Sequence, residues 1–200
     1  MFGMIIANLF GILFLFFFLW KRLKDDYHYE KIYNLGWVIL VSLVLGLLIS
    51  KILMPGFWFW ISFATIGLTF LFMIKNQKLK FFESLDGLII GILPLLGLNF
   101  LIDAIKRSSL SSFLMFWTVL ILIFLFFFLD SQYKRFSWYK SGRVGFTGLA
   151  IIGLFFIIRI FIYIIYPQTL SFIAPFDIYL SPTFAFLFFL ILYRLSVSKE

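Results

Sequence analysis

One arginine of this sequence lies inside a long apolar stretch, where a charged side chain is rare. Arg159 sits in the run Phe-Ile-Ile-Arg-Ile-Phe, seven residues before the stretch ends at Tyr166, about 10 Å of helix rise. A guanidinium is costly to place in hydrocarbon, so its presence indicates a functional or structural need. Its planar donors suit bidentate binding of phosphate. Two interpretations stay open: Arg159 faces a helix-bundle interior, or its side chain extends to lipid headgroups at the membrane surface.

A second group of polar residues follows the apolar stretch that ends at residue 102. Asp103 and Arg107 are four residues apart, the spacing of an ion pair on one helix face, and Asn99, Lys106 and four serines lie close by. One hypothesis is a basic site that receives phosphate, with Asp103 as the proton acceptor. The alternative is a solvated loop with a surface ion pair.

Other residues have simpler interpretations. Lys51 lies three residues before Met54, where an ammonium reaches lipid phosphates easily, either as a ligand or as an interface anchor. Asp86 follows Glu83 and Ser84 at the start of an apolar stretch, where acidic and hydroxyl groups favour a helix amino terminus. The small residues Gly87, Gly91 and Gly97 then predict close helix packing.

Metal and thiol chemistry find little support in the composition. The sequence has no cysteine and a single histidine, His28, which is expected to be a solvated loop residue. A disulfide framework, a thiolate nucleophile and a cluster of metal-binding histidines are therefore not expected. No metal and no cofactor is predicted.

The elements that carry these residues are predicted from hydropathy. The chain is 64% hydrophobic and 13% charged, with 31 phenylalanines, which excludes an ordinary water-soluble domain. A bilayer core needs roughly 20 apolar residues per helix. We therefore predict an all-α, polytopic transmembrane helix bundle, a single integral membrane domain over residues 1–200 with about seven spans. The ranges are 3–20, 32–54, 57–74, 84–102, 113–129, 144–166 and 179–193.

The two ends of the chain pose separate questions. No basic residue precedes the first range and Trp20-Lys21-Arg22 follows it, so we expect it to be retained as a helix rather than cleaved. The last range is short and contains Pro182. It is expected to tilt, to start further back near Phe172, or to be partly re-entrant.

The distribution of basic residues orients the bundle. The loops at 21–31, 75–80 and 134–143 carry four, three and four Lys or Arg, and all three would lie on one side together with the carboxyl-terminal tail. The loops of the opposite side hold only Lys106 and Arg107. Because basic loops stay cytoplasmic, the amino terminus is predicted outside and the carboxyl terminus in the cytoplasm. The net charge of +8 thus reflects topology and contact with anionic lipid, and no nucleic acid is expected as a partner.

The order of these features resembles the prolipoprotein diacylglyceryl transferase family of bacterial inner membranes. Residues 20–26, a basic loop, are similar to the segment after the family's first helix, and residues 78–86 with the apolar run to Pro94 are similar to the start of its fourth. The sharpest similarity is the basic glycine loop at 139–146 leading to Arg159 and Phe161. The family also has seven spans with the amino terminus outside.

The sequence departs from the family at three elements. The family's Gly-Arg-x-Gly-Asn-Phe signature corresponds to residues 97–103, which contain no arginine. Its His-Gly-Gly element has no counterpart at residues 64–67, and the glutamate after its sixth-helix arginine is Tyr163 here. Arg159 carries over, and Lys51 is a basic substitute for the family's second-span arginine.

The resemblance implies transfer of a diacylglyceryl group from phosphatidylglycerol to the lipobox cysteine thiol in the signal peptide of a prolipoprotein. Arg159 and Lys51, with Lys106 or Arg107, would bind the lipid phosphate, and Arg159 and Asp103 would be catalytic. A second hypothesis is a non-catalytic protein that keeps the scaffold and binds a phospholipid or a partner. A third is a small transporter or channel, which would favour several inward-facing ionisable groups or an internal repeat.

Overall fold

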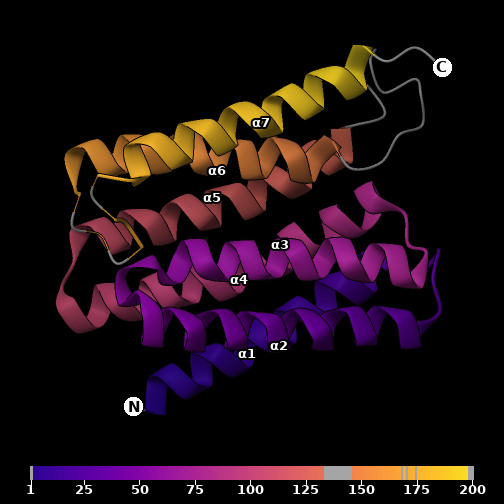
Figure 1. Ribbon diagram of the computed structural model, residues 1–200, viewed down its shortest axis with the longest axis horizontal. Coiled ribbons are helices and arrows are strands. Elements are labelled where there is room, and N and C mark those ends of the chain that lie inside the picture. Colours follow the sequence, from indigo (N-terminus) through magenta and orange to yellow (C-terminus); the bar gives the residue numbers. More distant parts are fainter. Residues whose placement is uncertain (1, 133–145, 168, 170, 174, 198–200) are drawn as a thin grey trace.

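The computed structural model describes residues 2–132, 146–167, 169, 171–173 and 175–197, and these residues form seven α-helices and no strand (Figure 1). Each helix is long and apolar enough to cross a membrane, and each predicted span falls on one of them. The helices are α1 (Phe2–Leu23), α2 (Tyr29–Leu53), α3 (Trp58–Gln77), α4 (Phe81–Arg107), α5 (Leu110–Gln132), α6 (Phe146–Ile165) and α7 (Asp177–Val197), with a short 3₁₀ turn, η1 (Pro55–Phe57), between α2 and α3.

Successive helices run in opposite directions, so α1 begins at one end of the bundle and α7 finishes at the other (Figure 1). The basic residues of 21–31 and 75–80, and Arg194, gather at the end where α1 finishes. We call it the inner end, and the opposite one, with Lys106 and Arg107, the outer end. The predicted clustering of these basic residues on one side is confirmed, and the assignment of that side to the cytoplasm stays a prediction. The third basic loop, at 134–143, lies outside the described residues.

The last span is a continuous helix. α7 contains 21 residues and begins at Asp177, two residues earlier than the predicted range. Pro182 lies inside it, close to its amino end, where the loss of one backbone hydrogen bond interrupts the helix least. The start near Phe172 and the partly re-entrant segment are therefore not observed.

Glycines set the closest helix crossings. A Cβ on Gly91 of α4 would lie 2.8 Å from the Leu15 side chain of α1, and one on Gly97 would lie 3.0 Å from Val119 of α5. Two of the predicted packing glycines are thus at tight crossings, whereas Gly87 has only ordinary contacts. These crossings confirm that small residues on α4 let α1 and α5 approach it closely.

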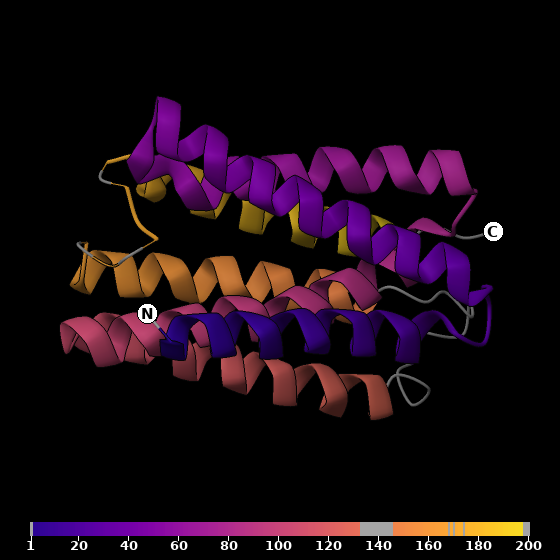
Figure 2. The same cartoon turned by 90° about the horizontal axis from the view of Figure 1, so that it is seen from below.

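The core has two parts. One lies among α4, α5, α6 and α7 and includes the first turns of α3, and the other lies among α1, α2, α3 and the inner half of α4. Figure 2 shows α2 and α3 on one side of the bundle and α1 and α5 on the other, with α4 and α6 between them. α2 and α3 pair closely, because Gly46 of α2 leaves room for Ser62 and Thr65 of α3. They form a hairpin that packs less closely against the other helices than its two helices pack against each other.

Candidate functional site

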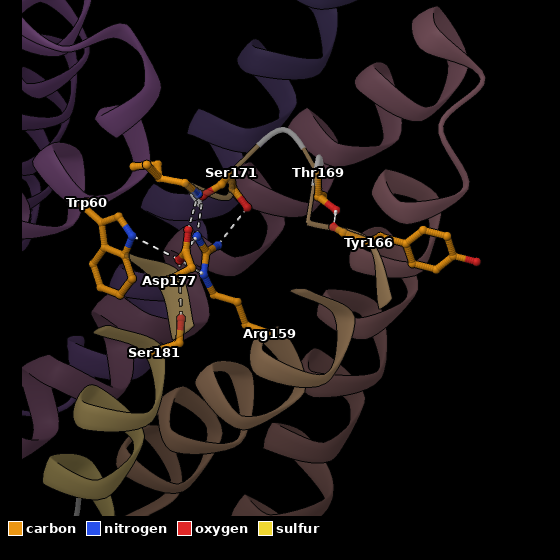
Figure 3. A network of polar contacts seen from close by, with 8 residues as sticks. Trp60, Arg159, Tyr166, Thr169, Ser171, Asp177 and Ser181 are labelled. Carbon is orange, nitrogen blue, oxygen red and sulfur yellow. Dashed lines mark hydrogen bonds and ion pairs between the residues drawn. The ribbon is translucent and has the colours of Figure 1, made fainter. Parts of the chain in front are cut away.

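Arg159 forms a buried ion pair with Asp177, the first residue of α7 (Figure 3). The Arg159 Nη2 atom lies 2.8 Å and the Nε atom 3.2 Å from the Asp177 Oδ1 atom, and both side chains are 0% exposed. Asp177 belongs at this position because a carboxylate at a helix amino terminus is stabilised by the free N–H groups and the helix dipole. The pair therefore joins α6 to α7 at the outer end.

The two terminal nitrogens of Arg159 also donate to Ser171. Nη1 donates to the Ser171 hydroxyl at 2.7 Å, and Nη2 also donates to the Ser171 carbonyl. The Phe59 and Phe172 rings lie over the guanidinium, with their centroids 4.0 Å and 4.6 Å from Cζ. Cation–π contact of this kind offsets part of the desolvation cost. Each of the three guanidinium nitrogens thus donates to a protein group.

The Asp177 carboxylate accepts hydrogen bonds from several surrounding segments. The Trp60 indole N–H donates to its Oδ1 atom at 3.1 Å, the Ser181 hydroxyl lies 3.5 Å from the same oxygen, and the backbone N–H of Ile173 donates to Oδ2. Figure 3 shows Trp60, Ser181 and Arg159 converging on this carboxylate, while the Tyr166 ring points away. The carboxylate thereby ties α3, α6, α7 and the loop before α7 together.

This geometry decides between the two interpretations of Arg159. Its side chain faces the bundle interior, and the alternative that it extends to the lipid headgroups is wrong because the residue has no exposed surface. Asp177 balances the charge of Arg159, and Ser171 accepts hydrogen bonds from the guanidinium N–H groups that a phosphate would otherwise bind. Its structural effect is to position α7 and Trp60.

The other predicted site residues lie apart from Arg159. Asp103 accepts a hydrogen bond from the Ser112 hydroxyl at 2.5 Å and pairs with Arg107 at 3.0 Å, which confirms the expected i, i+4 ion pair. Asp103 is buried, whereas Lys51, Lys106 and Arg107 are exposed at the outer end. The described partners of Arg159 are Asp177, Ser171 and aromatic rings, and they include neither Asp103, Lys51 nor Arg107. The structure therefore does not assemble the predicted residues into one group.

An apolar cleft of about 1220 Å³ lies between the α2–α3 hairpin and the helices α1, α4, α6 and α7. Its walls include mid-helix residues that are exposed, such as Val41 and Val44 of α2 and Leu68 and Leu71 of α3. Exposure in the middle of a spanning helix means that the cleft opens at the side of the bundle, toward the bilayer core. We call it the lateral cleft.

The polar groups of the lateral cleft are few. No charged residue lines it among the residues that the structure describes, and the side-chain amides are those of Asn8 and Asn99. Lys51 lies one helical turn beyond Leu47, a lining residue, on the same face of α2. A cation therefore stands just outside the outer end of the cleft.

The inner end has a polar junction of its own. Arg22 of α1 donates to Asp130 of α5 at 2.9 Å and to Asp86 of α4 at 3.1 Å, and the backbone N–H of Gly148 in α6 donates to Asp86 at 2.7 Å. Asp86 is 0% exposed and Arg22 is 24% exposed. One guanidinium and two carboxylates thus connect four helices. We call this group the inner junction.

The inner junction corrects the expected role of Asp86. Glu83 lies in the first turn of α4, as expected from the helix dipole, but Asp86 lies beyond it and bonds to other helices. Ser84 is buried and caps nothing, because α4 begins after Lys80 without a side-chain cap. Lys80 lies outside the span, and its hydrogen bond with Glu83 at 2.9 Å raises the pKa of its ammonium.

Gly148 offers a test of the inner junction. An alanine Cβ there would lie 2.5 Å from the Asp86 Oδ1 atom and 3.1 Å from its Cα, so Asp86 would have to move away from Arg22. We expect Gly148→Ala to lower the free energy of unfolding by about 1–3 kcal/mol, as overpacking does. Thermal denaturation in detergent micelles measures the change.

Gly67 of α3 provides the matched control, because nothing lies within 4 Å of a Cβ built on it. Gly67→Ala should raise the stability by about 0.5–1 kcal/mol through the ordinary helix preference for alanine. Equal shifts for the two alanine variants would show that the Gly148 contact with Asp86 does not limit the packing.

Asp177 and the inner junction were not among the predicted site residues. A buried arginine requires a partner, and on the predicted outer side the acidic residues are Asp103 and Asp177. The need for a partner could therefore have identified Asp177 as one of two candidates. For Gly148 the sequence offers no signal, because its role depends on how closely α6 approaches α4.

Within the described residues no three His, Asp or Glu side chains come together as a metal-binding group. The main polar or concave features of the described residues are therefore the lateral cleft, the Arg159 network and the inner junction. No family model, curated protein or solved structure matches the chain.

Proposed function

We propose that the protein binds a membrane phospholipid, with the acyl chains in the lateral cleft, and that it does so without catalysing a transfer. The observation that supports this proposal is the cleft itself, which is apolar, opens toward the bilayer core and has a volume of about 1220 Å³. That volume exceeds the roughly 300–1,000 Å³ of ordinary small-molecule sites. Its size and its lining suit hydrocarbon chains.

The proposed ligand is phosphatidylglycerol of a bacterial inner membrane, held with its headgroup at the outer end. Lys51 lies one turn beyond the lining residue Leu47, and Lys106 and Arg107 are exposed at the same end. An ammonium near the membrane surface attracts a lipid phosphate. The bound lipid would thus have its acyl chains in the cleft and its phosphate near Lys51.

Two contacts argue against catalysis. Arg159 is neutralised by Asp177 and coordinated by Ser171, so binding a phosphate would require a buried ion pair to separate. Asp103, the proposed base, is held by Ser112 and Arg107 and does not line the cleft. Neither residue is available in the role that the family resemblance implies.

The second candidate function is the diacylglyceryl transfer itself. It is favoured by the position of Asp103, one helical turn beyond the cleft residue Asn99 on the same face of α4. In that reaction the lipobox cysteine sulfur of a prolipoprotein would attack the lipid carbon that bears the phosphate ester. The C–O bond would break, glycerol phosphate would leave, and Asp103 would take the thiol proton.

Filling the cleft tests lipid binding directly. Gly67→Trp places a large side chain where the cleft is open, so we expect phosphatidylglycerol to bind about tenfold more weakly or worse. Native mass spectrometry of the detergent-solubilised protein, titrated with phosphatidylglycerol, measures the bound fraction.

The matched control is Gly3→Trp, which adds the same side chain at an open position on α1 away from the cleft. Binding by this variant should equal that of the unchanged protein. If Gly67→Trp binds as well as Gly3→Trp, the lateral cleft is not the lipid site.

A separate assay distinguishes binding from transfer. The purified protein is incubated with phosphatidylglycerol and a lipobox peptide, and mass spectrometry measures thioether-linked diacylglycerol. We expect no product under conditions in which an active transferase forms it. Product that disappears in the Asp103→Asn variant would establish the second candidate instead.

A further inference from the structure

We propose that the Asn8–Asn99 pair recognises the ester carbonyl of the bound lipid, so that the lateral cleft selects acyl-ester glycerolipids over ether lipids. This inference rests on the proposed function and specifies its ligand. It concerns the part of the lipid between the headgroup and the chains.

The two amides form a single unit with donors to spare. Asn99 Nδ2 donates to the Leu95 carbonyl at 2.8 Å and lies 3.5 Å from the Asn8 Oδ1 atom. The Nδ2 group of Asn8 donates to no residue that the structure describes. Both asparagines line the cleft, so this N–H pair is available to a ligand there.

The depth of the pair fits the ester region of a lipid. Asn8 is six residues into α1 and Asn99 eight residues before the end of α4, about 9 Å and 12 Å of helix rise below the outer end. Lys51 lies two residues before the end of α2, nearer the surface. A lipid with its phosphate near Lys51 would bring its esters to this depth, with its chains toward Phe70 and Phe81.

The physical reason for selectivity is the cost of an unpaired amide. Away from water, an N–H group without an acceptor is unfavourable. An ester linkage supplies that acceptor through its carbonyl oxygen, whereas an ether linkage has no carbonyl and its oxygen is a weaker acceptor. None of the described residues that line the cleft is a cation that could bind the lipid instead. Selection at this depth therefore depends on the carbonyl.

The test compares diacyl and dialkyl-ether phosphatidylglycerol of the same chain length by native mass spectrometry. We expect the unchanged protein to bind the ester lipid about threefold to tenfold more tightly, the size of one net hydrogen bond. Asn8→Leu should bind both lipids equally. Asn34→Leu, at an exposed asparagine outside the cleft, should keep the preference.

The outcomes separate this inference from the proposed function. Equal binding of the two lipids by the unchanged protein, with Gly67→Trp still weakening both, would overturn ester recognition and leave the cleft as the lipid site. The Asn8–Asn99 contact would then only join α1 to α4. Binding of both lipids that is unaffected by Gly67→Trp would overturn the proposed function itself. Because the first comparison uses the unchanged protein, it does not depend on the folding of a variant.

Discussion

Asp177→Ala is expected to destabilise the protein by about 3–5 kcal/mol, the cost of leaving a buried charge without its partner. Arg159 has no exposed surface, and Asp177 supplies the only carboxylate within ion-pair distance of it among the described residues. The same substitution removes the acceptor of the Trp60 indole and of the Ile173 backbone N–H. Thermal denaturation in detergent micelles should show a large fall in Tm.

A double variant separates the charge effect from the loss of shape. In Arg159→Met with Asp177→Leu neither charge of this pair remains, so most of the lost stability should return, since apolar replacements of buried ion pairs are often neutral. Asp25→Ala, at an exposed carboxylate between α1 and α2, should leave the Tm unchanged. If Asp177→Ala melts like Asp25→Ala, the ion pair does not hold α7 in place.

Arg22→Met is expected to have the second-largest effect, a loss of about 3 kcal/mol or more. Among the described residues, it leaves the fully buried Asp86 with the Gly148 N–H as its one remaining hydrogen-bond donor and leaves Asp130 without a paired cation. Two carboxylates would then face each other across α4 and α5. Loss of the folded fraction after heating, measured by size-exclusion chromatography, gives the size of the effect.

Lys21→Met is the neighbouring control, because Lys21 is exposed and, among the described residues, its ammonium lies over the rings of Phe17 and Phe127 rather than beside a carboxylate. It should change the folded fraction little. Combining Arg22→Met with Asp86→Asn and Asp130→Asn removes the unbalanced charge and should recover part of the stability. A triple variant no better than Arg22→Met would mean that packing of the arginine stem, rather than its charge, is what matters.

The fold was predictable because the bilayer constrains it strongly. A spanning helix must be apolar over about 20 residues, so hydropathy locates α1 to α6 with little competition from other structures. The start of the last span was harder to predict, because Asp177 and Pro182 interrupt the apolar pattern there. In the structure Asp177 begins α7, and a carboxylate at that point is favourable only because Arg159 and the helix dipole meet it there.

The site was predictable only where one residue carries its own signal. Arg159 stands out because its charge lies in an apolar run. Its partner does not, since Asp177 lies 18 residues further along, beyond a loop whose path the sequence does not define. Asp86 was interpreted from its helix alone, whereas its partners come from α1 and α6. The lateral cleft depends on the spacing of helices, which hydropathy does not report.

The lateral cleft has a consequence for handling the protein. At the outer end, Phe59, Trp60 and Phe63 of α3 contact α6 and α7 directly. Along the cleft, a space of about 1220 Å³ separates the α2–α3 hairpin from the helices opposite. In a bilayer hydrocarbon fills such a space, because an apolar void forfeits dispersion contacts on every wall. Under the proposed function, lipid in the cleft acts as part of the tertiary structure, and harsh delipidation would remove a section of the core without breaking a covalent bond.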